Sequence, residues 1–92
     1  MKVIDVNLKN VKTVRGFHRV VKKGLDAPEY YGYNLDALHD VLTSVGEETQ
    51  IVFHYFGTLK TLMPDFADTL DGLLTDVTQE NENLEIITID GE

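Results

Sequence analysis

Three short runs of β-branched and aromatic residues, separated by longer stretches of helical periodicity, constrain the fold of this 92-residue chain most strongly. The runs span Val3–Leu8, Gln50–Tyr55 and Leu84–Ile89. Strands that are separated by helical connections pair in parallel, with right-handed crossovers. We therefore predict an α/β fold built on a three-stranded parallel sheet. The second run is the most continuously apolar, which predicts a central strand buried on both faces.

The first connection predicts a helix that begins after Thr13, whose hydroxyl can cap it, and stops near Gly24, before Pro28. Apolar residues recur here at helical spacing: Val14, Phe17, Val20, Val21 and Leu25. The opposite side is basic: Arg15, Arg19, Lys22 and Lys23. This pattern is typical of an amphipathic helix on a core. We expect His18 on the helix face beside Phe17.

The stretch Pro28–Val45 predicts a loop followed by a second helix, which Asn34 can cap with its side-chain oxygen. One stripe of this helix is apolar: Leu35, Leu38, Leu42 and Val45. Another stripe is polar: Asp36, His39, Asp40 and Thr43. Asp36 suits the positive end of the helix dipole, but Asp40 lies mid-helix, where aspartate is a poor helix former. A residue that costs stability suggests a role in function, although a solvated helix face also carries charge by default.

The remaining chain predicts two more helical segments and the last strand. A polar turn at 46–49 precedes the second strand, and Leu59–Met63 predicts a short helical turn. Pro64, at a first helical position, opens a longer helix that ends before the polar residues 79–83. Its apolar stripe comprises Phe66, Leu70, Leu73, Leu74 and Val77. We expect about four helices against the sheet, in a single domain of residues 1–92.

Charge is unevenly distributed along the chain. The net charge is −8, but residues 1–25 hold seven Lys or Arg and one acid, whereas residues 26–92 hold Lys60 and fifteen acids. A chain this acidic disfavours direct contact with nucleic acid, which depends on cations that neutralise phosphate. A basic protein is the natural partner, since complementary fields speed encounter. Acidity that serves solubility alone is the alternative.

Two further features bound the location of the protein. There is no cysteine, which excludes a disulfide framework and a thiolate nucleophile. The first residues lack a signal-peptide core, and no run of about 18 apolar residues could span a membrane. We therefore expect a cytoplasmic protein that does not associate with membranes.

The residues give little support to metal or catalytic chemistry. No two of His18, His39 and His54 have the spacing of metal ligands, and His54 is expected to face solvent or a neighbouring strand. Asp36 and Asp40 are one helical turn apart and could form a catalytic carboxylate pair. Such pairs normally converge from different segments in a cleft, however, whereas one helix face forms a ridge. We predict no metal, no cofactor and no enzymatic activity.

The pattern P-E-Y-Y-G-x-N-L-D-A-L-x-D-x-L-T, from Pro28 to Thr43, closely resembles the barstar family, the intracellular inhibitors of barnase-type ribonucleases. The resemblance implies a barstar-like fold whose loop and second helix plug the active-site cleft of a nuclease. Asp40 corresponds to the family aspartate that occupies a phosphate subsite. The matching partner-binding positions are Tyr30, Gly32, Asp36, His39, Asp40, Thr43 and Ser44. His39 and Val45 stand where the best-known member has tryptophans, and Ser44 where it has glycine.

Three tyrosines in four residues suit a binding surface, because tyrosine combines a large contact area with a polar end. We expect Tyr30 to be an exposed anchor and Tyr31 to pack inward, although all three could simply tie the loop to the core. The resemblance also implies Asp76, on the long helix, as a second acidic contact. His39 lies between two acids, which favour its cation, and this predicts an affinity that changes with pH around neutrality.

The leading hypothesis is a stoichiometric inhibitor, monomeric when free, that keeps a basic secreted ribonuclease of the barnase type harmless before export. The acidic helix and the loop before it would mimic RNA phosphate. An acidic interaction module on the same scaffold, with a basic partner that is not a nuclease, is the alternative. An acid-dependent hydrolase is a third class, which would show turnover of its own.

Overall fold

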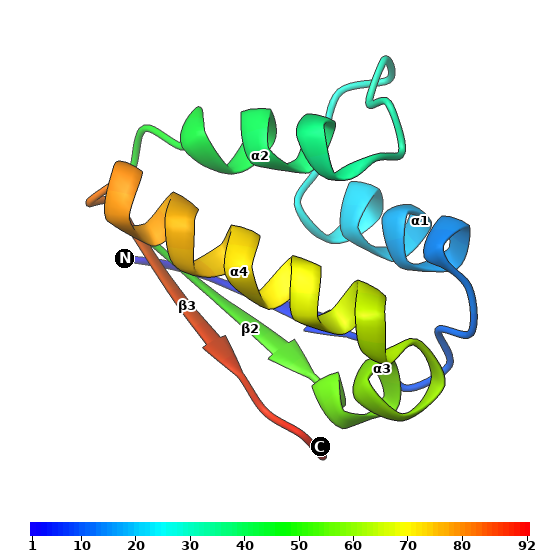
Figure 1. Cartoon of the computed structure of the whole chain (residues 1–92). Helices are drawn as coiled ribbons and strands as arrows, with labels where there is room; N and C mark the ends of the chain where they lie inside the picture. The colour runs from blue at the N-terminus through cyan, green and yellow to red at the C-terminus, as the bar shows by residue number, and fades with distance from the viewer.

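A computed structural model describes all 92 residues as one sheet covered by helices (Figure 1). The elements follow in the order β1 (Lys2–Asn7), α1 (Val14–Gly24), α2 (Leu35–Thr43), β2 (Thr49–His54), α3 (Phe56–Leu62), α4 (Pro64–Glu80) and β3 (Leu84–Thr88). The three strands are parallel, in the order β1-β2-β3. The predicted α/β class, the parallel sheet, the four helices and the central position of β2 are confirmed.

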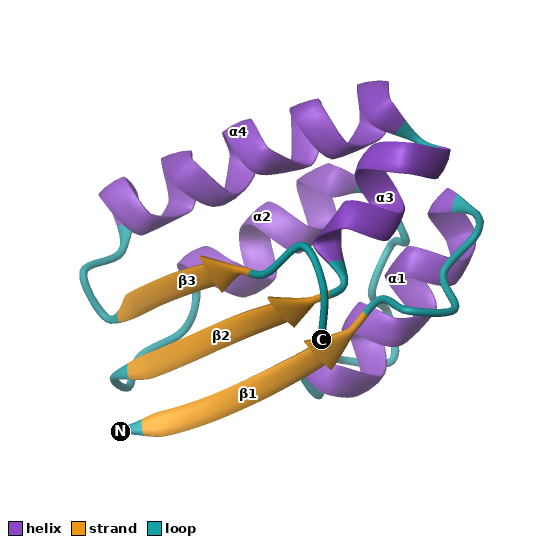
Figure 2. Ribbon diagram, turned by 90° about the horizontal axis from the view of Figure 1, so that it is seen from below, coloured by secondary structure: helices purple, strands orange, loops and turns teal.

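The strand order explains why one face of the sheet carries no helix. Each new strand is added on the same side of the last, and crossovers of the usual right hand then place both helical connections over the same face. Figure 2 shows the helices on one side of the strands, with α3 beyond their carboxyl ends. On the covered face Ile4, Ile51 and Ile86 share one register. We call the other side the helix-free face.

Burial of β2 on both faces, as the sequence predicted, holds only in the middle of the strand. Ile51 and Phe53 are fully buried beneath the helices, and Val52 on the helix-free face is 9% exposed. Gln50 and His54 flank Val52 on that face and remain partly exposed. Their side chains bond to neighbouring strands, so this face of β2 is a polar network around one apolar residue.

Helix α1 begins as predicted, because the Thr13 hydroxyl accepts a hydrogen bond of 2.9 Å from the Gly16 amide. Phe17 and Val21 are fully buried in the core. The expectation for His18 was incomplete, because the side chain is 0% exposed. Its ring packs edge-on against Phe17 and Phe66. The helix therefore turns a histidine into the protein together with most of its apolar stripe, whereas Val14, in the first turn, is 41% exposed.

The last part of the chain departs from the prediction at α3, which begins at Phe56 rather than Leu59. The residues after β3 return to this point, and the Phe56 and Gly57 amides donate to the carbonyls of Ile89 and Asp90. A Cβ on Gly57 would lie 2.8 Å from the Asp90 carbonyl oxygen, so only glycine fits without a shift. Helix α4 begins at Pro64, as predicted, but it continues to Glu80 and so includes the first two of the polar residues 79–83 that were expected to follow it.

Candidate partner-binding surface

Helix α2 presents its acids to solvent because its apolar side is fixed against the core. The Asn34 side chain caps the helix by accepting a hydrogen bond of 2.8 Å from the Ala37 amide. Leu38 and Leu42 are fully buried, and this sets the rotation of the helix. Asp36 and Asp40 then lie on the exposed side. Neither carboxylate forms an ion pair within the chain.

The C-terminal end of α2 is held by Asn81, the residue that follows α4. Its amide nitrogen donates to the Leu42 carbonyl at 3.1 Å and to the Val45 carbonyl at 2.9 Å. The last carbonyls of a helix lack i+4 partners within the helix, and Asn81 adds a short bond to each of these two carbonyls. Their other bonds are longer, 3.4 Å from the Val45 amide to Leu42 and 3.5 Å from the Asn83 side chain to Val45. Asn81 is 9% exposed. In the sequence Asn81 stands out only as part of a polar break, because its partners are far away along the chain.

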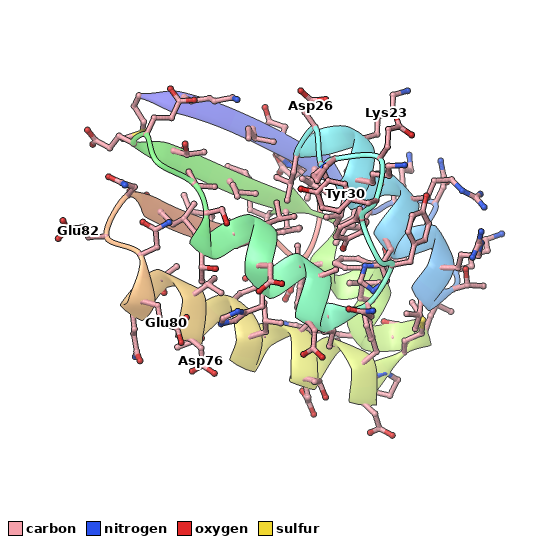
Figure 3. All side chains as sticks on the ribbon, turned by 90° about the horizontal axis from the view of Figure 1, so that it is seen from above. Lys23, Asp26, Tyr30, Asp76, Glu80 and Glu82 are labelled. Carbon is pink, nitrogen blue, oxygen red and sulfur yellow. The ribbon has the colours of Figure 1, made fainter.

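The loop before α2 divides its tyrosines as the sequence predicted. Tyr30 is 87% exposed, whereas Tyr31 is 6% exposed; Figure 3 labels Tyr30 in the loop beside α2. Gly32 is exposed, and its carbonyl accepts a hydrogen bond of 3.2 Å from the Asn34 side chain. A Cβ on Gly32 would lie 3.2 Å from that same Asn34 nitrogen. Any larger residue would therefore press on the group that caps α2.

Tyr31 anchors the loop on His18. Its hydroxyl shares a buried hydrogen bond of 2.7 Å with His18 Nδ1, and the other ring nitrogen, Nε2, has no partner. Burial, with a smaller effect from Tyr33, raises the pKa of Tyr31 to about 12. Burial lowers the pKa of His18, since a charged imidazole would be poorly solvated there. Both side chains are therefore neutral near pH 7, and the bond is one between uncharged groups.

A groove of about 600 Å³ separates the loop from α2. Apolar side chains contribute much of its lining: Leu25, Ala27, Pro28, Val41 and Val45. Its polar lining includes Asp36 and Asp40 from the helix and Tyr30 from the loop. An apolar wall beside unpaired carboxylates suits an arginine or lysine side chain, whose stem is apolar and whose end is charged. We call this feature the acidic groove.

The structure gathers five of the eight predicted site residues at the acidic groove: Tyr30, Gly32, Asp36, Asp40 and Ser44. The hydroxyl of Ser44 donates to the Asp40 carbonyl at 2.6 Å, so its proton is already used in ending the helix. Thr43 is similar, because its hydroxyl donates to the His39 carbonyl at 2.9 Å. These hydroxyls can offer a partner their lone pairs rather than a free proton.

His39, Thr43 and Asp76 lie outside the groove. His39 was expected beside Asp36 and Asp40, but its Nε2 forms a contact of 2.9 Å with the Glu80 carboxylate of α4. Asp76 is exposed one turn before Glu80, and Figure 3 labels both acids along α4. The histidine therefore connects two helices. Nothing local in the sequence points to Glu80, because only the packing of α2 on α4 brings it to His39.

The arrangement of the side chains and the lengths of the helices bear on metal binding and on membrane spanning. No three His, Cys, Asp or Glu side chains come together in a way that could hold a metal ion. None of the four helices combines the length and the apolar character that crossing a bilayer requires. What the surface does offer is an exposed groove lined by three carboxylates without an ion pair, those of Asp26, Asp36 and Asp40. The class it defines is a small α/β domain with an acidic face.

Comparison with known proteins identifies the family. The sequence model of the family described as "Barstar (barnase inhibitor)" matches residues 1–89. A protein of Bacillus subtilis (strain 168), named "Putative ribonuclease inhibitor YrdF", is 31% identical over 81 residues, which cover 87% of this chain and 89% of the relative. The chain belongs to the barstar family. Both descriptions are of inhibitors, so membership indicates an inhibitor-like role with a ribonuclease as partner, rather than an enzyme.

Proposed function

We propose that this protein is a stoichiometric inhibitor of a basic, secreted ribonuclease of the barnase type, and that it blocks the cleft of the nuclease with α2 and the loop before it. One observation carries the proposal: Asp36 and Asp40 border an exposed groove and have no ion-pair partner within the chain. A carboxylate that forms an ion pair within the fold already has a cationic partner. These two are free to bind cations from outside.

The mechanism is mimicry of the RNA backbone. A ribonuclease holds phosphate with cationic side chains, and a carboxylate accepts the same charge-assisted hydrogen bonds as a phosphate oxygen. The N-cap at Asn34 and the buried Leu38 and Leu42 fix α2, so the carboxylates are ordered before binding. Ordering in advance removes an entropy cost from association. Tyr30 adds a large exposed ring at the edge of the same groove.

The net charge of the chain supports the same partner. The charge of −8 would attract a cationic enzyme and steer its approach, which favours rapid capture of a nuclease before export. A single copy of the chain carries the whole groove, so we expect a 1:1 complex. The cytoplasm, where an unexported nuclease would endanger RNA, is the compartment in which such an inhibitor would act.

Titration of a guanyl-specific microbial ribonuclease with this protein, while RNA hydrolysis is followed, tests the proposal. We expect full inhibition at one equivalent. Asp40→Ala should weaken inhibition by about 30- to 150-fold, because removal of an ionic hydrogen-bond partner costs ~2–3 kcal/mol. Asp36→Ala should come next, at roughly tenfold. The fold should be unchanged in both variants, because the two carboxylates form no ion pair within the chain.

A matched control separates local contact from net charge. Glu85→Gln removes one negative charge on the helix-free face and keeps an oxygen that can accept the hydrogen bond from Gln50. It should inhibit like the parent. If the Asp40→Ala and Asp36→Ala variants also inhibit like the parent, the proposed face is wrong. No inhibition by the parent itself would favour an acidic module with another basic partner.

A further inference from the structure

The loop between α1 and α2 has, near each of its ends, a residue in a left-handed backbone conformation. Asp26 and Tyr33 both have φ of 52°, and neither is glycine. Aspartate adopts this conformation with some ease, because its short side chain can bond locally, but a bulky tyrosine rarely does. Tyr33 therefore needs contacts that hold it, and it directly precedes the residue that caps α2.

Helix α1 supplies those contacts with two basic side chains. The guanidinium of Arg15 lies 5.2 Å from the centre of the Tyr33 ring, and the ammonium of Lys22 lies 5.9 Å from it. Both distances are within the range of cation–π attraction. The two cations are seven residues apart, about two turns, so they lie on one stripe of the helix. The ring of Tyr33 spans that stripe.

His18 completes the same stripe, because positions 15, 18 and 22 recur at helical spacing. It holds Tyr31 by the buried hydrogen bond described above. The rings of Tyr31 and Tyr33 also contact each other, with centres 5.6 Å apart. Lys22 further approaches the exposed carboxylate of Glu29 at 3.7 Å. One stripe of α1 thus contacts the loop at both Tyr31 and Tyr33.

This arrangement also accounts for two positive charges on a protein with an acidic face. Arg15 and Lys22 are directed at a ring of their own chain, where their charge helps to hold the loop. They lie on α1, whereas the carboxylates of the acidic groove come from α2. The two kinds of charge therefore have separate tasks, one toward a loop of the same chain and one toward a partner.

We infer that Tyr33 is a positioning residue for partner binding: clamped by Arg15 and Lys22, it pre-forms the loop that carries Tyr30 and Gly32 to the edge of the acidic groove. The inference rests on the proposed function, because it assigns a role within the same surface. Its physical basis is that a loop ordered before contact loses less entropy on association.

Three substitutions separate the ring of Tyr33 from its backbone conformation. Tyr33→Phe keeps the aromatic face for the two cations. Tyr33→Asn and Tyr33→Gly tolerate a positive φ but remove the face. If only the backbone mattered, the asparagine and glycine variants would match or exceed the parent. The clamp predicts the reverse order, with phenylalanine close to the parent and the other two weaker.

The free protein provides a first readout, which needs no nuclease. Within the loop, the Tyr31 amide donates to the Pro28 carbonyl at 2.9 Å, so its hydrogen exchange reports opening of the loop. We expect exchange to be about five- to tenfold faster in Tyr33→Asn and in Arg15→Gln/Lys22→Gln, and unchanged in Tyr33→Phe. Amides of β2 should exchange as in the parent, which shows that the core is intact.

Binding provides the second readout. Against a guanyl-specific microbial ribonuclease, Tyr33→Asn should bind about five- to tenfold more weakly than the parent, and Tyr33→Phe within about twofold. Unchanged loop exchange in Tyr33→Asn, or faster exchange with unchanged binding, would overturn the inference. Failure of Asp40→Ala to weaken inhibition would instead overturn the proposed function, and the exchange data of the free protein would still decide whether the clamp exists.

Discussion

The acidic groove and the helix-free face use the same residue types in opposite ways. On the helix-free face Asp5 pairs with His54 at 2.7 Å, and Glu85 accepts a hydrogen bond of 2.8 Å from Gln50. At the groove Asp36 and Asp40 have no such partner within the chain. The difference teaches that exposure alone does not mark a binding site in an acidic protein. The acids that indicate a binding site are those that the fold holds in place without an ion-pair partner in the chain.

Among side chains that form hydrogen bonds within the fold, Asn81 should have the largest effect on stability. Asn81→Ala would remove the side-chain hydrogen bonds to the Leu42 and Val45 carbonyls at the end of α2 and leave each carbonyl with one longer bond. We expect a loss of about 2 kcal/mol in the free energy of unfolding, because two hydrogen bonds worth about 1 kcal/mol each are lost. Urea denaturation measures this change. An unchanged midpoint would show that another group holds the end of α2.

His18 provides the next test, because its protonation makes the stability of the fold depend on pH. The pKa of His18 is lowered from 6.5, so the unfolded chain binds a proton at a pH where the folded chain does not. Acid therefore favours unfolding, and stability should fall as pH drops below about 6.5. Urea midpoints between pH 5 and pH 8 should show this loss in the parent and a weaker loss in His18→Gln. Equal slopes would contradict the assignment.

His54 should show the opposite and smaller dependence. Its hydrogen bond to Asp5, and a second one to the main-chain oxygen of Glu92, raise its pKa above 6.5. The folded chain then holds a proton that the unfolded chain releases. The resulting stability is full below pH 6.5 and is lost as pH rises through the raised pKa. His54→Gln should remove this loss on the alkaline side, and a loss that persists would point to another group.

Much of the fold could be predicted from the sequence because its signals are local. The three strand runs, the caps at Thr13 and Asn34 and the start of α4 at Pro64 depend on neighbours within a few residues. The free carboxylates of α2 followed from helical periodicity and the apolar stripe at Leu38 and Leu42. Each of these predictions needed only the spacing of residues along the chain.

The misses that bear on the site involve partners that are distant in sequence. The early start of α3 depends on contact between Gly57 and Asp90, at the far end of the chain. The contact of His39 with Glu80 likewise exists only after α2 has packed on α4. Buried His18 gave a weak signal, since it lies one helical turn from Val14 and Val21, beside the apolar stripe, where a polar residue needs a buried partner. Nothing local identified that partner as Tyr31.

One comparison tests the central claim most directly: the dissociation constants of Asp40→Asn and Glu85→Gln for the same guanyl-specific ribonuclease, measured by calorimetry at one ionic strength. Both changes remove a single negative charge, one at the acidic groove and one on the helix-free face. We predict that Asp40→Asn weakens binding by about 30-fold or more, because it removes an ionic partner from the interface, and that Glu85→Gln stays within about twofold of the parent. Equal losses in the two variants would show that the ribonuclease responds to net charge, and would contradict a binding site at the groove.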